Sequence, residues 1–156
     1  MFIRALLPVD GSRPSLSAVE SAVRAVSPAG EIVLCHVIPT FESLVAGTAT
    51  SARDSQVAME LAQHSHASRM REAQDYLSEA ERQVEEAQGR VLYRLILQGE
   101  AGPQILRAAS THGCDVIAMA TNGRSGWRRA ILGSVADFVA RNAEGVPVLL
   151  VRRSED

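Results

Sequence analysis

The stretch Met119–Val135, MATNGRSGWRRAILGSV, lies between a short apolar run and an amphipathic helical pattern. The apolar run, Asp115–Ala120, predicts a buried strand, and the helical pattern begins at Val135. The stretch holds three glycines and three arginines, and no Asp or Glu occurs from Val116 to Ala136. Free backbone N–H groups and the positive end of a helix dipole meet where such a loop joins a helix, which favours an anion. We therefore expect this loop to hold the phosphates of a nucleotide.

Strand and helix patterns alternate along the whole chain. Helices are predicted from Ser12 to Pro28, from Gln56 to Gln88, from Gly102 to Gly113, and after the loop to about Asn142. Strands are predicted at Phe2–Val9, Glu31–Ile38, Arg90–Leu97, Asp115–Ala120 and Val146–Val151. This order predicts a single α/β domain over residues 1–156, with an open five-stranded, parallel, doubly wound, Rossmann-like sheet and helices on both faces.

The segment before the longest helix has no clear period. Phe41–Ser55 is rich in Ser, Thr, Ala and Gly, so we expect a mobile loop or lid. The long helix carries one apolar stripe: Met70, Ala73, Leu77, Ala80, Val84 and Ala87. The stripe is short and rich in alanine, so it favours packing on the sheet over the competing interpretation, a coiled coil.

Composition is that of an ordinary globular protein. The chain has 156 residues, 46% of them apolar, and its net charge of −2 offers no general attraction to nucleic acid. Cys35 and Cys114 lack metal-site spacing and predict buried free thiols in a reducing compartment. The sequence shows no signal-peptide pattern and no apolar run of membrane-spanning length, so we expect a cytoplasmic protein without a membrane or nucleic-acid partner.

The ends of the first and fourth strands are predicted to share a crevice. In doubly wound sheets, ligands bind beyond the carboxyl ends of the strands, where the strand order reverses. Asp10 follows the first strand, and its carboxylate suits the hydrogen-bond donors of a ribose or an adenine edge. The alternative is an Asp-Gly turn that only starts the next helix. Chain position alone leaves both interpretations open.

The loop after the fourth strand supplies the other candidates. Gly123 and Gly133 allow a close backbone approach, and the Ser134 hydroxyl can cap the helix or donate to a phosphate. Ordinary turn glycines are the alternative. The loop arginines are candidate phosphate clamps or solvated surface charges: Arg124, Arg128 and Arg129.

Sequence patterns for strong catalysis or for a metal site are missing. We find no Ser-His-Asp arrangement, no HExxH and no Walker A loop, and the chain contains no lysine. His64 and His66 point to different faces of a helix and form a poor metal pair. His36, within the second strand, predicts a hydrogen-bonded core residue. We therefore assign no catalytic residue and no metal ligand.

These residues resemble the universal stress protein family over nearly the whole length. The resemblance rests on Pro8-Val9-Asp10-Gly11-Ser12, on His36-Val37, and on the late block from Asn122 to Arg152. The nucleotide-binding branch carries G-x2-G-x9-G-(S/T), of which Gly123 and Gly133-Ser134 match the second part. Ala120 stands where that branch has its first glycine.

The resemblance implies a fold like that of adenine nucleotide alpha hydrolases, and it implies a ligand. The ligand is ATP, with ADP or AMP as alternatives, accompanied by Mg²⁺ on the phosphates. The residues expected around the adenosine are Pro8, Val9, Asp10 and Val37. Those expected around the ribose and phosphates are Met119, Ala120, Asn122, Gly123, Arg124, Gly133, Ser134 and Val135. Family members pair as homodimers through the last strand, here Val146 to Val151, whose apolar edge independently invites a partner.

Three functions follow as expectations. The first is a dimeric, cytoplasmic, ATP-binding sensor or regulator of a stress response. The second is a slow ATP hydrolase or nucleotide transferase that uses Mg²⁺ held by the phosphates. The third is a nucleotide-free dimeric interaction module in which Ala120 has closed the pocket.

Overall fold

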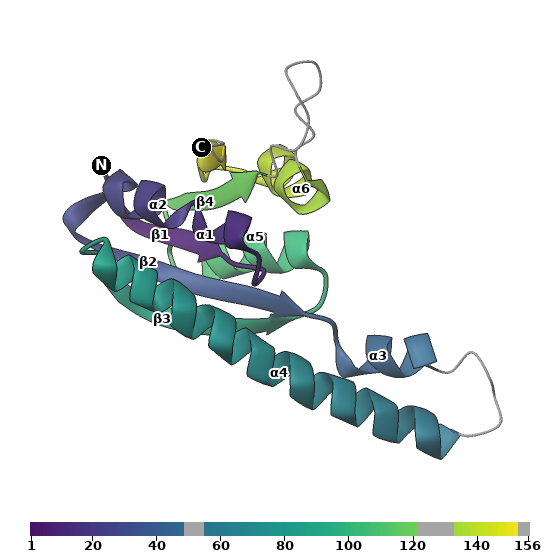
Figure 1. Cartoon of the computed structure of the whole chain (residues 1–156). Coiled ribbons are helices and arrows are strands. Elements are labelled where there is room, and N and C mark those ends of the chain that lie inside the picture. The colour runs from purple at the N-terminus through teal and green to yellow at the C-terminus, as the bar shows by residue number, and fades with distance from the viewer. Residues whose placement is uncertain (49–54, 122–132, 153–156) are drawn as a thin grey trace.

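The computed structural model describes residues 1–48, 55–121 and 133–152 and contains a five-stranded sheet. All pairings are parallel, and the strand order is β3-β2-β1-β4-β5 (Figure 1). From β1 the chain adds β2 and β3 on one side and then β4 and β5 on the other, so the strand order reverses between β1 and β4. The strands are β1 Phe2–Pro8, β2 Val26–Ile38, β3 Val91–Gln98, β4 Val116–Thr121 and β5 Val148–Arg152. The predicted fold class is confirmed.

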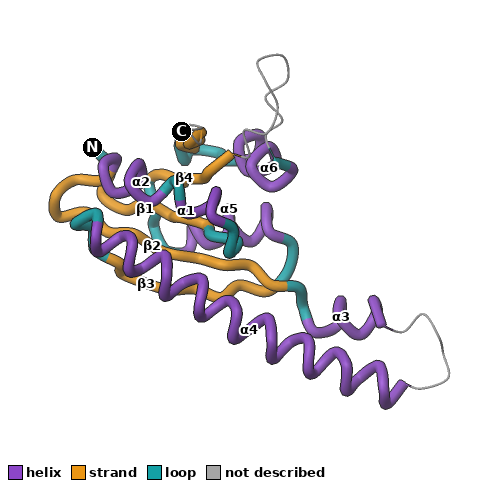
Figure 2. The backbone as a smooth tube through the Cα atoms, viewed as in Figure 1, coloured by secondary structure: helices purple, strands orange, loops and turns teal. Residues whose placement is uncertain are grey.

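Helices cover both faces of the sheet (Figure 2). The helices are α1 Arg13–Leu16, α2 Val19–Ala25, α3 Phe41–Thr48, α4 Ser55–Glu86, α5 Ala101–Thr111 and α6 Ser134–Asn142. One core cluster lies between the sheet and α2 and α4, and it includes Leu7, Leu34 and Leu77. A second cluster lies between the other face and α5 and α6. Within the described part of the chain, no helix is long and apolar enough to span a membrane.

The predicted helix between Ser12 and Pro28 is wrong in its extent. It forms two short helices, and residues 26–30 are extended because β2 already begins at Val26, opposite Phe2. Ser15 donates its hydroxyl to the Ser12 carbonyl (2.8 Å), a local bond that competes with a continuous helix. Pro28 lacks an N–H and disfavours the helical conformation of the residue before it, which is consistent with a helix that ends earlier.

The predicted loop Phe41–Ser55 is also wrong where the structure describes it. Residues 41–48 form α3, Ser55 begins α4, and residues 49–54 lie outside the described residues. Thr40 caps α3, because its hydroxyl accepts the Ser43 N–H (3.2 Å). The ring of Phe41 meets that of His66 on α4 edge-on, with centroids 6.1 Å apart. Thr40 in the sequence was a signal for the start of this helix. It was missed because the segment after it shows no helical period of apolar residues.

The long helix α4 does more than cover the sheet. With 32 residues it is about 48 Å long, and its amino-terminal half extends past the sheet beside α3 (Figure 1). Four residues of the predicted stripe are buried: Ala73, Leu77, Ala80 and Val84. Met70 and Ala87 are half-buried, and Ala87 lies just past the end of the helix.

The carboxyl end of α4 is a Schellman motif. Gly89 donates to the Val84 carbonyl and Gln88 to the Glu85 carbonyl, at 2.8 and 2.9 Å. The left-handed residue of the motif is Gln88, with φ 64°. Gly89 is nevertheless constrained, because a Cβ there would lie 2.7 Å from a methyl of Val23.

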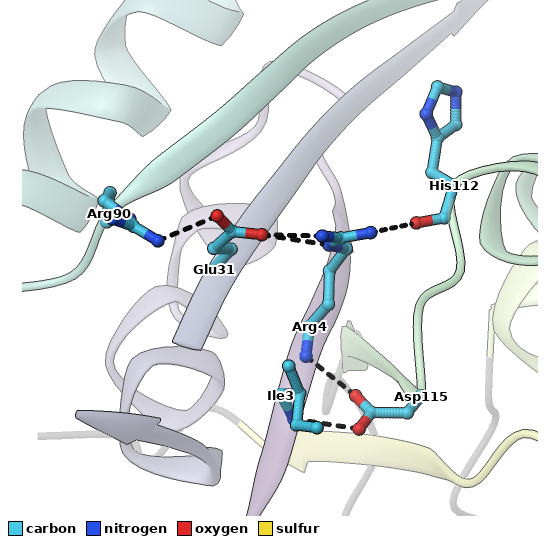
Figure 3. A network of polar contacts seen from close by, with 6 residues as sticks. All are labelled: Ile3, Arg4, Glu31, Arg90, His112 and Asp115. Atoms are coloured by element: carbon cyan, nitrogen blue, oxygen red, sulfur yellow. Dashed lines mark hydrogen bonds and ion pairs between the residues drawn. The ribbon is translucent and has the colours of Figure 1, made fainter. Parts of the chain in front are cut away.

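A polar network joins β1, the middle of β2 and the residues just before β3 and β4 (Figure 3). The Arg4 guanidinium donates to Glu31 (2.7 Å) and to the His112 carbonyl (2.8 Å), and Arg90 reaches the other Glu31 oxygen at 2.8 Å. The Asp115 carboxylate accepts the backbone N–H groups of Arg4 and of the residue before it. This network lies at the opposite end of the sheet from the strand ends that were predicted to bind a ligand.

The ion pairs of Glu31 in this network make the stability of the fold depend on pH. The hydrogen bond from Arg4 holds the pKa of the Glu31 carboxyl below its usual value of 4.5, although desolvation opposes it. The stabilising contribution is therefore complete above that usual value and is lost as the pH falls toward the lower folded-state pKa. We expect Glu31→Gln to lower the melting temperature at neutral pH and to flatten its fall between about pH 5 and pH 3. Calorimetric melting over this range tests it, with the exposed Glu144→Gln as the control. Parallel curves for Glu31→Gln and the parent would contradict the assignment.

Candidate functional site

A cavity of about 260 Å³ opens at the carboxyl ends of β1 and β4, where the strand order reverses. This is the position at which doubly wound sheets bind ligands. The volume lies just below the usual range for small-molecule sites, about 300–1,000 Å³. The predicted residues that line it are Pro8, Val9, Asp10, Val37, Met119, Ala120, Gly133, Ser134 and Val135. Asn122, Gly123 and Arg124 lie outside the described residues, as do Arg128 and Arg129.

The cavity wall also contains residues that the sequence did not single out for ligand contact. They are Ser12, Ser15, Cys35, His36, Ala101, Ile105 and Ala136. Two of them, Cys35 and His36, directly precede Val37, so their place at the end of the second strand was a usable signal. Ala101 and Ile105 belong to α5, whose nearness to this crevice depends on how the helix packs.

The turn after β1 holds Asp10 beside the cavity. One Asp10 carboxylate oxygen accepts both the backbone N–H (2.9 Å) and the hydroxyl (2.5 Å) of Ser12. Partial desolvation raises the pKa of the Asp10 carboxyl, but the bonds from Ser12 outweigh it and bring the pKa below its usual value. Asp10 is thus ionised at neutral pH, and its exposed carboxylate can accept further donors. The two interpretations of Asp10 are compatible, because the same residue shapes the turn and faces the cavity.

Gly11 follows in the same turn and has φ +81°, a left-handed conformation that suits glycine. A Cβ at this position would lie 2.3 Å from the ring of Tyr76 on α4. The turn therefore packs directly on an aromatic side chain.

His36 forms part of the wall next to this turn. Its Nδ1 lies 2.7 Å from the Val9 carbonyl oxygen, so Nδ1 carries the proton and donates. The His36 ring also meets the Tyr76 ring edge-on, with centroids 5.3 Å apart and an interplanar angle of 68°. The prediction of a hydrogen-bonded His36 is confirmed, and this residue is half-buried at the cavity rather than deep in the core.

The opposite wall is the amino terminus of α6. The first helical bond runs from the Asp137 N–H to the Gly133 carbonyl (2.9 Å), so the three preceding N–H groups have no partner within the helix. Gly133 holds the N-cap position, with φ −54°, and Ser134 is the first residue of the helix rather than its cap. Among the described residues, no atom lies within 4 Å of a Cβ built at Gly133. The described part of the fold therefore leaves room for a side chain at this position.

The acidic side chain in the first turn of α6 is paired with an arginine. Asp137 lies in the first turn of α6, and its carboxylate accepts the Arg141 guanidinium at 2.8 and 2.9 Å. This ion pair reduces the repulsion that Asp137 would exert on a bound anion.

Cys35 contributes an inert part of the wall. Cys35 and Cys114 are both buried and free, as predicted. Burial raises the pKa of the Cys114 thiol to about 11 and raises that of Cys35 still further. Neither thiol is ionised at neutral pH, so neither suits nucleophilic chemistry. In the described ranges, no group of three or more His, Cys, Asp or Glu side chains could hold a metal ion.

The cavity thus combines apolar walls with two polar ends. Asp10 offers an anionic acceptor on one side, and the α6 terminus offers backbone donors on the other. The arrangement suits a ligand with hydroxyl or amino donors at one end and an anion at the other.

The comparisons with known proteins match this chain to one protein family. The model of the universal stress protein family matches residues 1–152. The universal stress protein MJ0531 of Methanocaldococcus jannaschii is 28% identical over 153 residues, which is 98% of this chain and 84% of that protein.

Three solved structures share the fold. The hypothetical protein MJ0577 superposes with a TM-score of 0.75 at 24% identity, covering 100% of this chain and 99% of that one. A universal stress protein in complex with cAMP gives 0.65 at 19% identity, covering 98% of each chain. The Archaeoglobus fulgidus universal stress protein in complex with dAMP gives 0.64 at 16% identity, covering 95% of this chain and 96% of that one.

Proposed function

Because this chain belongs to the universal stress protein family, we propose that its cavity binds an adenine nucleotide. The preferred ligand is ATP, with Mg²⁺ on its phosphates, and AMP or ADP are the alternatives. The protein acts as a cytoplasmic sensor or regulator of a stress response, in which nucleotide occupancy carries the signal. The cAMP and dAMP complexes of two proteins with this fold support the choice of an adenine nucleotide.

One observation carries the proposal. The amino terminus of α6 lines the cavity and has N–H groups without helical partners, and no described residue crowds the position of a Cβ at Gly133. A phosphate group fits this position, because it needs donors and a close backbone approach. We assign the phosphates to Gly133, Ser134 and Val135.

The other end of the ligand is assigned to the opposite wall. Asp10 and Val37 contact the adenosine, with Pro8 and Val9 lining its pocket, and Met119 and Ala120 border the ribose. For Asn122, Gly123 and Arg124 the assignment to the phosphates rests on the sequence motif.

Ala120 does not argue for a nucleotide-free module. Ala120 is one of the residues that line a cavity of about 260 Å³, so the crevice is open with alanine at this position. Ala120 is half-buried and pairs in register with Val151 of β5, so the strand holds its backbone.

A thermal-shift titration tests the proposal. At a Mg-ATP concentration of about 100 times Kd, we expect the melting temperature to rise by about 5–10 °C. Asp10→Ala removes a charged acceptor and should weaken binding roughly tenfold or more, so the rise at that concentration falls to about half or less. Asp75→Ala, which removes an exposed carboxylate of α4, is the matched control. An equal rise for Asp10→Ala and the parent would overturn the role given to Asp10, and no rise with any adenine nucleotide would overturn the function.

We also propose that the protein forms a homodimer, as expected from the family, in which two copies pair through the last strand, Val146 to Val151. β5 lies at the edge of the sheet and pairs only with β4 among the described strands. Its side chains Val148, Leu149, Leu150 and Val151 are only partly buried within one chain, which supports this assignment.

A further inference from the structure

The pairing of β1 with β2 ends abruptly at the cavity. The last paired residues are Pro8 and Cys35, and one further bond runs from the Val9 N–H to the Cys35 carbonyl (2.8 Å). The Val9 carbonyl then accepts a side-chain donor, Nδ1 of His36, at 2.7 Å. The imidazole therefore donates to a carbonyl oxygen that, in a continuing parallel ladder, would accept the backbone N–H of Val37.

This substitution affects the neighbouring residue of β2. In a parallel strand, the N–H and C=O of one residue point to one neighbouring strand, and those of the next residue point to the other neighbour. The Cys35 carbonyl faces β1, so the backbone groups of Val37 face the same side, beyond the end of β1. Val37 lines the cavity at this place, and its peptide edge is left for a ligand.

A second contact holds the same turn from α4. The ring of Tyr76 packs on Gly11, where even a Cβ would lie 2.3 Å from the ring, and the ring edge also contacts His36. The Asp10 carboxylate bonds to Ser12 within the turn, so those bonds shape the turn without fixing its position over the sheet. The contacts of Val9 and Gly11, on either side of Asp10, supply that position.

We propose that His36 and Tyr76 are positioning residues of the nucleotide site. They clamp the Val9–Ser12 turn so that the Asp10 carboxylate and the Val37 peptide edge face the ligand together. This inference rests on the proposed function, since it concerns how the same cavity recognises the nucleoside end of its ligand. The long helix α4 is thereby part of the site, although its only contribution is Tyr76.

Double-mutant cycles with Asp10→Ala test the clamp, with the Kd for Mg-ATP measured by calorimetry. Tyr76→Ala removes the ring, and His36→Phe removes the Nδ1 donor while keeping a planar ring. Each should weaken binding about fivefold, the scale of one hydrogen bond. In the Asp10→Ala background each loss should be clearly smaller, because a misplaced turn matters little once the carboxylate is gone. The loss for Tyr76→Ala should shrink toward onefold, and the loss for His36→Phe should shrink to the part that the Val37 peptide edge contributes.

The conservative variants separate positioning from general stability. Tyr76→Phe keeps the ring on Gly11, and His36→Asn keeps an N–H donor near the position of Nδ1. Both should bind within about twofold of the parent, whatever their melting temperatures. If Tyr76→Ala does not fold, the His36 cycle decides alone.

Three results would overturn the inference. One is Tyr76→Ala and His36→Phe binding as tightly as the parent while Asp10→Ala binds weakly, which leaves the proposed function intact. The second is the same loss in both backgrounds. The third is a folded parent protein that binds no adenine nucleotide, which would overturn the proposed function together with the inference.

Discussion

Gly133→Val is expected to weaken Mg-ATP binding roughly hundredfold, a loss of about 2.7 kcal/mol of binding free energy. The added side chain would stand in front of the first N–H groups of α6, where we place the phosphates. The fold should tolerate the change, because φ is −54° and no described atom lies within 4 Å of a Cβ at this position. Valine is a poorer helix cap than glycine, so we expect a stability loss of about 1 kcal/mol at most.

Gly47→Val is the matched control for this variant. Gly47 lies in α3, and a Cβ there also meets nothing within 4 Å, so the same side chain is added away from the cavity. Its Kd should equal that of the parent. Unchanged binding by a folded Gly133→Val protein would show that the phosphates lie elsewhere.

Leu34→Ala is expected to reduce the free energy of unfolding by about 3 kcal/mol. Leu34 lies on β2, has no exposed surface, and belongs to the cluster between the sheet and the helices α2 and α4. Truncation removes buried apolar surface and leaves a cavity beneath α4. The surrounding residues cannot move to fill it, because the sheet fixes their backbone. Urea unfolding measures the change through the midpoint at constant slope.

Leu61→Ala provides the comparison for the core. Leu61 lies in the projecting half of α4 and is 54% exposed, so its truncation should change stability by less than about 0.5 kcal/mol. Equal losses for Leu34→Ala and Leu61→Ala would contradict the location of the core.

The sheet could be predicted because its strands are buried on both faces. Such strands give short continuous apolar runs, and the described bounds of four strands differ from the predicted ones by no more than two residues. The fifth, β2, begins five residues earlier than expected, since Val26 pairs with Phe2 across a bulge. Pairing of this kind depends on a distant strand and leaves no local signal.

The candidate site could be predicted where it depends on strand ends. Asp10 follows from the sheet topology, which brings the carboxyl ends of parallel strands to one edge. Val37 and Met119, which also line the cavity, were expected only from the resemblance to the family. Tyr76 could not be found in this way. It lies in the middle of a helix and contacts the turn only because α4 crosses the sheet above Gly11.

The central claim is that this cavity binds an adenine nucleotide. The most direct test is a calorimetric titration of the nucleotide-free protein, checked by its ultraviolet absorbance, with Mg-ATP, followed by ADP and AMP. We predict saturable heat with one nucleotide bound per chain. A folded protein that gives no saturable heat with any of the three would contradict the account.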